Sequence, residues 1–412
     1  MKRIHFLLRV IWVGLVILVL VACGSNGKST PNLDLTATAD YATQLHLCCT
    51  ATPQITATIP PPPPNNSNIV LDRGNAQRTG VYDVPSIRHQ PEVKWQTKVS
   101  STWLMPPMLA DGMLYTGSGD GVLYALNAET GEMIWSAGVF EGLESTGAIA
   151  GDTIVTGGFS KLVQAFDRYT GNVLWKYKSG YVVQGSPLIV EDRVFIATDH
   201  VVYALGLQTG ELIWKVATGN EGAFMGAPAY DNGVIYTTGG KLLFALDSET
   251  GKEVWRVEKD AMFLGLAVAN QHVYVGNWDL HLYAFDQSTG KEHWKFKGKG
   301  EFWSAPAVNG DMVYAGNIDQ YVYALNTQTG ELLWSYKTGG DAVSEPLIAD
   351  GVVYVSDSSH LFPRGPRHLY ALDALTGKEL WVFESVSTFL PAPALGNGVI
   401  YITSTGEVLA LK

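Results

Sequence analysis

Short apolar runs separated by turn-forming residues recur along most of the chain. In residues 302–337, four such runs follow one another and predict strands at 305–308, 312–315, 321–325 and 331–336. Asn, Gly, Asp and Thr lie between these runs, and these residue types favour tight turns. Four short strands within about 40 residues are typical of one blade of a β-propeller.

A tryptophan near the end of each such unit recurs at an almost constant interval. Successive intervals are 40, 40, 39, 41, 39, 40 and 47 residues. A fixed period of this length indicates a repeat architecture. We expect these tryptophans to dock each blade against the next, and they are Trp95, Trp135, Trp175, Trp214, Trp255, Trp294, Trp334 and Trp381.

Seven of the eight tryptophans end the phrase Ala-x-Asp-x-x-Thr-Gly-x-x-x-Trp, with Asn often in place of Asp. Asp or Asn opens a turn by accepting bonds from backbone amides, and Gly adopts the left-handed conformation that closes it. Ala leaves room for an indole to lie flat against the backbone. Gly206 replaces the Asp in one copy, so we expect that turn to be the softest.

The two ends of the repeat region each lack one part of a blade. No Tyr-Ala-Leu strand precedes Trp95, and no Thr-Gly-Trp phrase follows residues 408–411. A strand at 93–99 is therefore expected to complete the blade begun by residues 391–411. The predicted fold is an all-β, eight-bladed propeller closed by N- and C-terminal strands in one blade. The longer last interval predicts an insertion at 358–367, between two strands of blade seven.

Residues 1–22 have the features of a lipoprotein signal peptide. Lys2, Arg3 and Arg9 precede an apolar run that is short for a membrane span and suits a signal-peptide core. The run ends in Leu-Val-Ala-Cys, which resembles a bacterial lipobox with Cys23 as the acylated residue. The alternative is a cytosolic apolar N-terminus with a chance cysteine.

Residues 23–68 are expected to be a disordered tether, followed by the propeller at 69–412. The stretch is rich in Thr, Pro, Asn and Ser and contains five consecutive prolines at 60–64. Such a composition cannot bury a core, and consecutive prolines favour an extended polyproline II conformation. Lipid chains on Cys23 would then hold the propeller to a membrane through this tether.

Charge and cysteine content argue against several kinds of binding partner and against a disulfide-stabilised fold. Without residues 1–22, 25 basic residues remain against 39 acidic ones, a net charge of −14. No basic cluster is present to neutralise phosphates, so the sequence argues against nucleic acid and against adhesion to anionic lipid. None of the three cysteines lies in the repeats, so the fold uses no disulfide framework.

The repeated phrase resembles the tryptophan-docking motif of PQQ-type eight-bladed propellers, and residues 73–80 look like the segment that often leads into them. This resemblance implies the fold and two very different activities. One is quinoprotein alcohol or glucose dehydrogenase. The other is scaffolding, as in outer-membrane barrel-assembly lipoproteins of the BamB type. Fold alone does not choose between them.

A dehydrogenase of this family would need PQQ, calcium, an aspartate base and often two adjacent cysteines over the quinone. Cys48-Cys49 lies in the tether, about 40 residues before the first blade strand. We expect these cysteines to be either free thiols of the linker or a surface disulfide. The blades are minimal, with no Cys-x-x-Cys-His haem site and no His-x-x-x-His zinc spacing. We therefore predict no catalysis, no cofactor and no metal site, with PQQ and calcium as the alternative.

Acidic residues are frequent in the loops expected at one end of the blades. Asp is an ordinary turn former, and a calcium site would need several carboxylates to converge. We expect this face to be strongly negative. Its acids comprise Asp120, Asp279 and Asp319 in turns, and Glu141, Glu144, Glu221, Asp260, Glu301 and Asp341 in connections between blades.

Aromatic residues precede the first strand of several blades, near the expected mouth of the central channel. Either they close the channel mouth or they form a binding rim for a peptide, a strand edge or a glycan. Trp278, in a turn, is close to the same mouth. The rim candidates are Trp103, Tyr181, Phe224, Phe263, Trp303 and Phe389.

The sequence thus predicts a monomeric, lipid-anchored, extracytoplasmic propeller that binds a protein or peptide partner as an assembly scaffold. Gly24 after the acylated cysteine fits sorting to the periplasmic side of an outer membrane, if the cell has one; otherwise the protein would lie at the cell surface. The alternatives are a PQQ-dependent dehydrogenase and a surface receptor for sugar or peptide.

Overall fold

The short apolar runs form strands throughout the residues that the computed structural model describes. These are residues 69–138, 142–143, 145–219, 226–340, 342–358, 367–385 and 391–412, all within the unit Ala57–Lys412. The predicted signal peptide and the whole of the predicted tether, with Cys23 and Cys48-Cys49, lie outside them. No helix in these ranges has the length and apolar character needed to cross a membrane.

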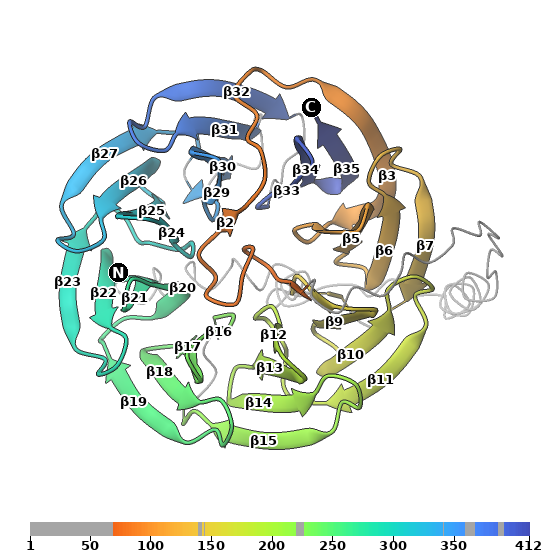
Figure 1. The fold of residues 1–412 in the computed structure, drawn as a ribbon, viewed down its shortest axis with the longest axis horizontal. Coiled ribbons are helices and arrows are strands. Elements are labelled where there is room, and N and C mark those ends of the chain that lie inside the picture. Colours follow the sequence, from red (N-terminus) through yellow and green to blue (C-terminus); the bar gives the residue numbers. More distant parts are fainter. Residues whose placement is uncertain are drawn as a thin grey trace, which may run out of the picture. The chain divides into compact units, whose positions relative to one another are not determined.

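Eight sheets surround a common axis as the blades of a propeller, which confirms the predicted fold (Figure 1). Each blade has antiparallel strands A to D, from the axis outward. Blades one to four comprise β4 (Met108–Ala110), β5 (Met113–Gly117), β6 (Val122–Asn127) and β7 (Met133–Gly138); β8 (Ala148–Ala150), β9 (Thr153–Gly157), β10 (Leu162–Asp167) and β11 (Val173–Lys178); β12 (Leu188–Val190), β13 (Arg193–Ala197), β14 (Val201–Gly206) and β15 (Leu212–Ala217); and β16 (Ala229–Asp231), β17 (Val234–Gly239), β18 (Leu242–Asp247) and β19 (Glu253–Glu258).

The other four blades follow the same order, and blade eight takes its strand D from the N-terminal side. They comprise β20 (Phe263–Ala269), β21 (His272–Asn277), β22 (His281–Asp286) and β23 (Glu292–Lys297); β24 (Ala307–Asn309), β25 (Met312–Asn317), β26 (Tyr321–Asn326) and β27 (Leu332–Lys337); β29 (Leu347–Ala349), β30 (Val352–Ser358), β31 (Arg367–Asp373) and β32 (Glu379–Ser385); and β33 (Ala394–Gly396), β34 (Val399–Thr403), β35 (Thr405–Leu411) and β3 (Val93–Trp103). The predicted insertion separates β30 from β31, and β28 (Ala342–Val343) pairs with β30.

The ring closes as predicted, through β3 and β35. Val93 pairs with Leu411 and Trp95 with Ala410. The amide of Glu92 donates to the carbonyl oxygen of Lys412 at 2.8 Å, and the Lys412 amide donates back at 2.9 Å. Hydrogen bonds between the two chain segments therefore replace the C–D turn that the other blades form covalently.

Seven of the eight docking tryptophans reach from strand D to the C–D turn of the following blade. Each indole N–H donates to a backbone carbonyl there, which satisfies a buried donor while the ring fills the seam. Seven such bonds join Trp95 to Ala128 (3.0 Å), Trp135 to Arg168 (2.9 Å), Trp175 to Leu207 (2.7 Å), Trp214 to Ser248 (2.9 Å), Trp255 to Gln287 (3.0 Å), Trp294 to Thr327 (2.8 Å) and Trp334 to Ala374 (3.0 Å).

The glycine of the repeated phrase has a second role that sequence reasoning did not include. Gly251 has a φ of +70°, which favours glycine in the turn. A Cβ atom at this position would also lie 2.7 Å from the Trp214 ring, too close for any side chain. The expected role of the alanine holds as well, because Ala245 lies directly across from Trp255 in the sheet.

The eighth tryptophan docks differently. Blade eight has no C–D turn to offer Trp381, and its indole N–H instead donates to the carbonyl of Ile87 at 2.8 Å. The Ile87 amide donates to the Tyr354 hydroxyl at 2.7 Å. The segment that leads into β3 therefore supplies the missing docking partner.

Residues 69–82, here called the N-terminal plug, lie inside the ring near its axis (Figure 1). Its strand β1 (Ile69–Val70) pairs antiparallel with β8, and β2 (Val81–Tyr82) pairs parallel with β29. Between them, plug carbonyls accept from the last amide but one of strand A in four successive blades. These bonds run from Tyr230 to Ala76 (2.8 Å), Val268 to Gln77 (2.9 Å), Val308 to Thr79 (2.8 Å) and Ile348 to Gly80 (2.7 Å).

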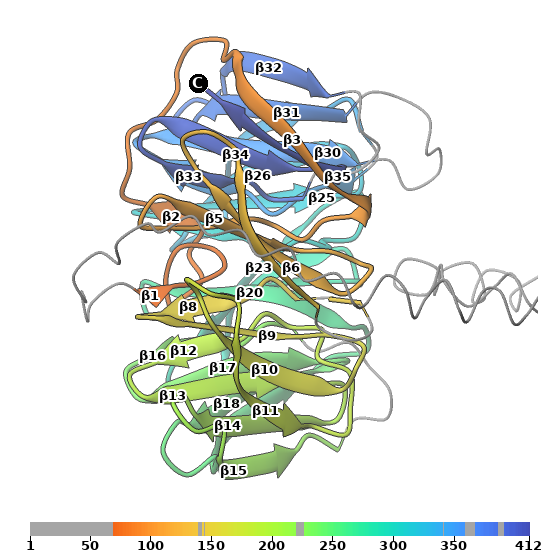
Figure 2. The same ribbon diagram turned by 90° about the vertical axis from the view of Figure 1, so that its right-hand side faces the viewer.

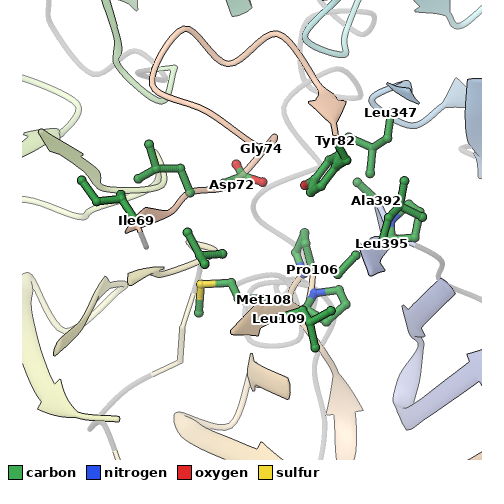
Figure 3. Close-up of a pocket in the computed structure, with 15 residues that line it drawn as sticks. Ile69, Asp72, Gly74, Tyr82, Pro106, Met108, Leu109, Leu347, Ala392 and Leu395 are labelled. Atoms are coloured by element: carbon green, nitrogen blue, oxygen red, sulfur yellow. The ribbon is translucent and has the colours of Figure 1, made fainter. Parts of the chain in front are cut away.

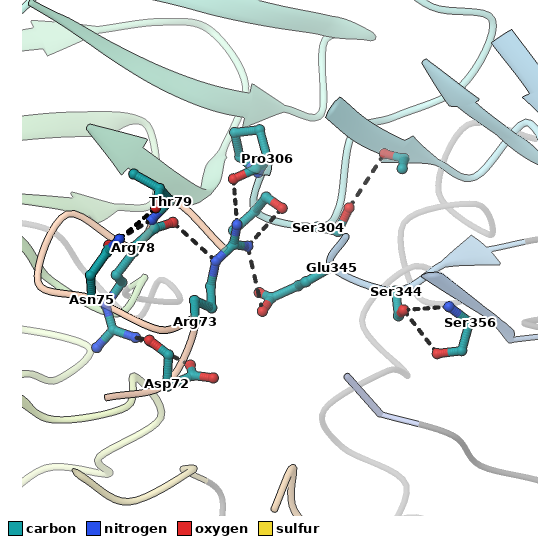
Figure 4. Close-up of polar contacts among 12 residues, drawn as sticks. Asp72, Arg73, Asn75, Arg78, Thr79, Ser304, Pro306, Ser344, Glu345 and Ser356 are labelled. Carbon is teal, nitrogen blue, oxygen red and sulfur yellow. Dashed lines mark hydrogen bonds and ion pairs between the residues drawn. The ribbon is translucent and has the colours of Figure 1, made fainter. Parts of the chain in front are cut away.

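Two arginines fix the plug in the channel (Figure 4). Arg73 and Arg78 are 2% and 1% exposed. Arg73 donates to the carbonyls of Ala305, at 2.7 Å, and Pro306. Arg78 donates to the carbonyl of Pro228 at 2.6 Å and pairs with Asp72 at 3.2 Å. Each buried guanidinium thus has acceptors and an acidic partner, as buried charges require.

Candidate binding face

Antiparallel strands place the D–A connections and the B–C turns at the same end of every blade. We call this end the binding face, because it carries the predicted rim. In the side view the strands run across the picture between this face and the opposite one (Figure 2). Of the rim candidates, Tyr181 and Trp303 lie in connections that lead into strand A of their blades.

Trp278 and Trp303 form a stacked pair on this face. Their ring centres are 5.9 Å apart, with planes inclined by 28°. Trp278 belongs to the B–C turn of blade five, and Trp303 lies in the connection from blade five to blade six. The Trp303 indole N–H donates to Glu301 Oε2 at 2.6 Å. The Trp278 indole nitrogen is buried and has no hydrogen-bond acceptor among the described residues.

Tyr181 and Trp103 are exposed rim residues, at 39% and 36%. The Tyr181 ring packs edge-on against His200, with ring centres 4.7 Å apart. Trp103 is the last residue of β3, pairs with Thr405, and covers Gly119, where a Cβ atom would lie 2.3 Å from its ring. These two residues lie on the binding face.

The prediction for Phe263 is wrong. This side chain is fully buried and packs edge-on against Tyr283 and Phe285. An irregularity between Phe263 and Leu266 starts β20 earlier than the inner strands of other blades and turns the ring into the core. The other two rim candidates, Phe224 and Phe389, lie outside the described residues.

The turn aspartates bind neighbouring side chains rather than converging. Asp279 accepts from the Tyr283 hydroxyl at 2.5 Å, and Asp319 from the Tyr323 hydroxyl at 2.6 Å. Burial and then the adjacent carboxylate raise the pKa of each tyrosine. Asp120 accepts from Ser100 at 3.0 Å. These acids stabilise turns, while Glu141, Glu144, Glu221 and Asp341 lie outside the described ranges.

Two small cavities lie along the central channel in the part of the chain that the structure describes. One, of about 150 Å³, lies between the plug and the inner strands of blades one and eight, and Ile69, Tyr82, Leu109 and Leu395 line it (Figure 3). The other, of about 190 Å³, is lined by both plug arginines, Glu345 and small residues of the D–A connections. The plug therefore divides the interior of the ring.

Glu345 is the acidic group at the second cavity. Its carboxylate lies 3.5 Å from Arg73, and 35% of its side chain is accessible. Since Glu345 lines the cavity, this accessible surface faces the channel. Burial raises the pKa of Glu345, and the attraction of Arg73 opposes that rise. In the described part of the chain, no three or more His, Cys, Asp or Glu side chains group closely enough to hold a metal ion.

The curated proteins that match part of this chain include the following three. BamB of Yersinia pestis is 26% identical over 53% of this chain and 60% of its own length. Tetrathionate hydrolase of Acidithiobacillus ferrooxidans is 29% identical over 38% of this chain and 29% of its own length. Quinoprotein ethanol dehydrogenase of Pseudomonas aeruginosa is 27% identical over 36% of this chain and 22% of its own length. Each match spans less than two thirds of the relative, and the relatives include both assembly factors and enzymes.

The crystal structure of BamB from Moraxella catarrhalis shares the fold. It superposes with a TM-score of 0.65 at 21% identity, over 78% of this chain and 100% of the other. The family model described as outer membrane protein assembly factor BamB matches residues 88–218, 198–302 and 281–412. These overlapping matches cover every blade, so the chain belongs to this BamB family of PQQ-repeat propellers.

Proposed function

We propose that this protein is a non-catalytic scaffold that binds an extended segment of a partner protein at the Trp278–Trp303 pair. The observation that carries the proposal is this stacked pair of half-buried indoles on the binding face. By analogy with the relatives named as assembly factors, the partner would be an outer-membrane protein during its assembly.

The chemistry of the pair suits an extended protein chain. Tryptophan is enriched among the residues that contribute most binding energy at protein interfaces. An extended segment presents apolar side chains, which would cover the accessible parts of the two rings. Glu301 holds the Trp303 ring in place before binding, which lowers the entropy cost of association.

The channel also favours a scaffold over a quinone enzyme. The plug fills the axis, its arginines are fully engaged with backbone carbonyls and acids, and cavities of about 150 and 190 Å³ remain. The enzyme relatives match 38% and 36% of this chain and only 29% and 22% of their own length.

The binding test uses a fluorescently labelled outer-membrane β-barrel protein, diluted from urea, with anisotropy as the readout. Trp303→Ala is expected to weaken binding by about 1–3 kcal/mol, roughly 5- to 150-fold, while the melting temperature changes little. Leu174→Ala is the matched control, because Leu174 is 50% exposed on the outer strand of blade two, away from the pair. Equal affinity of wild type and Trp303→Ala would exclude the pair as the site.

The dehydrogenase alternative has a direct test. The protein would be mixed with PQQ and calcium and assayed for dye reduction over a set of alcohols and aldoses. We expect no turnover above the level of free PQQ. Robust turnover that a chelator abolishes would replace the scaffold proposal with quinoprotein catalysis.

The lipid anchor is a separate part of the proposal. Cys23 follows Leu-Val-Ala after a basic and apolar head, and acylation there would hold the propeller on the extracytoplasmic side of a membrane. Cys23→Ser is expected to leave the protein soluble or unprocessed on cell fractionation. A processed variant that still sediments with membranes would exclude acylation as the anchor.

A further inference from the structure

Blade five differs from the other blades at two positions that meet in space. His272 begins its strand B, and His293 immediately precedes its docking tryptophan. At the first position other blades have Met113, Thr153, Arg193, Val234, Met312, Val352 and Val399; at the second they have Ile134, Leu174, Ile213, Val254, Leu333, Leu380 and Lys94. One blade of eight therefore has histidine at both positions.

The hydrogen bonds of the two rings determine which nitrogens are free. His272 Nδ1 lies 2.7 Å from the Asn270 carbonyl oxygen, and His293 Nε2 lies 2.8 Å from the Gln328 carbonyl oxygen. A carbonyl oxygen accepts only, so these two ring nitrogens carry the protons. His272 Nε2 and His293 Nδ1 therefore keep lone pairs when the rings are neutral.

We propose that His272 and His293 form a binding site for a divalent transition-metal ion with a preference for imidazole, such as Cu²⁺, Ni²⁺ or Zn²⁺. The ring centres are 4.5 Å apart and the planes are inclined by 37°. With metal–nitrogen bonds of about 2.0–2.1 Å, two imidazoles at right angles around one ion have centres about 4.5 Å apart. Metal-binding histidines usually donate their other N–H to a carbonyl or carboxylate, as both do here.

The local electrostatics favour a bound cation. Asp286 lies directly across the sheet from His272 and adds a negative charge nearby. Water would occupy the remaining coordination positions.

The site would connect blade five to blade six on the face opposite the tryptophan pair. Asn270, which accepts from His272, also donates its side-chain amide to the Gly310 carbonyl of blade six at 2.7 Å. Gln328, which accepts from His293, lies in the C–D turn of blade six. A bound ion would join strands B and D of blade five and stiffen this seam, independently of partner binding.

The experiment titrates the full-length protein with Cu²⁺, Ni²⁺ and Zn²⁺ by calorimetry and measures melting temperature with and without each ion. His293→Leu and His272→Met introduce residues that other blades carry at these positions, so both variants should fold. His89→Ala removes an exposed histidine elsewhere. All four proteins retain the same cysteines, so any metal binding by thiols cancels in the comparison.

We expect wild type and His89→Ala to bind one ion that each blade-five variant binds about 10-fold or more weakly. The thermal stabilisation by metal should disappear in both variants, and Ca²⁺ and Mg²⁺, which prefer oxygen ligands, should give none. Identical isotherms for wild type and His293→Leu would overturn the proposal. An equal loss in His89→Ala would also overturn it, by showing non-specific binding to surface histidines.

Discussion

The outer ring of docking tryptophans and the N-terminal plug both hold the eight blades together, in opposite ways. The tryptophans repeat one contact from blade to blade, with the same donor and the same kind of acceptor. The plug contacts successive blades through a different residue each time. Repetition distributes stability among many equivalent bonds, whereas each plug contact occurs once and has no substitute.

Blade eight, which closes the ring, depends both on a docking tryptophan and on contacts that occur only once. Changes in this blade should therefore lower the free energy of unfolding more than changes elsewhere. Deleting residues 409–412 removes buried Leu409 and Leu411 and the exchange of bonds between Glu92 and Lys412. Two buried leucines alone account for about 4–10 kcal/mol of unfolding free energy. We expect a loss of at least about 5 kcal/mol in urea denaturation, or no folded protein.

The control for this deletion is the double variant Leu332→Ala and Leu333→Ala, which truncates two leucines of the outer strand of blade six. They are 48% and 49% exposed, so we expect a change of about 1 kcal/mol or less. A deletion variant as stable as the control would mean that β3 and β35 do not close the ring.

A single docking tryptophan should have the next largest effect. Trp255→Ala opens a cavity in the seam between blades four and five and removes the bond to Gln287, at a cost of about 3–5 kcal/mol. Trp303→Ala, on the binding face, is the control and should cost about 1 kcal/mol. Unfolding free energies that agree for the two variants would show that the seam does not depend on the indole.

The repeated part of this comparison was predictable from sequence. Many copies of one phrase identify the blade, the docking tryptophan and the missing strands at each end, because every copy obeys the same packing requirement. The plug was not predictable in the same way. Residues 73–80 occur once, and their role depends on carbonyls of residues more than 100 positions away, such as Pro228 and Pro306.

The plug contacts can be weakened through one buried arginine. Arg78→Met leaves the carbonyls of Pro228, Ser186 and Pro187 and the carboxylate of Asp72 without their donor. Removing one partner of a buried ion pair costs about 3 kcal/mol. Arg88→Met is the control, because 50% of the Arg88 side chain is exposed. If chemical denaturation gave equal stabilities for both variants, the plug would not contribute to holding the ring.

The candidate site was predictable only in part. Position before strand A placed Trp303 at the end of the blades where the structure has it, but position cannot show which way a ring points. Phe263 faces the core because its strand begins early with an irregular register. The stacking of Trp278 on Trp303 and the contact of His272 with His293 join residues 25 and 21 positions apart. Such contacts arise from blade geometry, so residue spacing gave no indication of them.

The smallest expected effect concerns the one repeated turn that departs from the phrase. Asp247 accepts from the Thr250 amide at 2.8 Å and from its hydroxyl at 2.6 Å, whereas Gly206 has no side chain to do so. Backbone bonds from Gly210 to Gly206 and from Gly206 to Glu211 show that the turn itself is the same. A Cβ atom on Gly206 would approach the Thr209 hydroxyl to 2.8 Å, which a rotation of Thr209 can relieve.

Gly206→Asn should therefore raise the unfolding free energy by about 0.5–1 kcal/mol, through the added cap and a less flexible unfolded chain. Gly206→Asp should give a similar gain at pH 7. Hydrogen bonds from Thr250 lower the pKa of Asp247 in the equivalent turn. An aspartate cap of this kind stabilises the fold at pH values above its unfolded pKa of about 4. The stabilisation is lost as the pH falls through the lower pKa of the folded state. Denaturation at pH 7 and pH 3 should show the aspartate gain shrinking relative to the asparagine gain. Equal gains at both pH values would mean that the new carboxylate does not cap the turn.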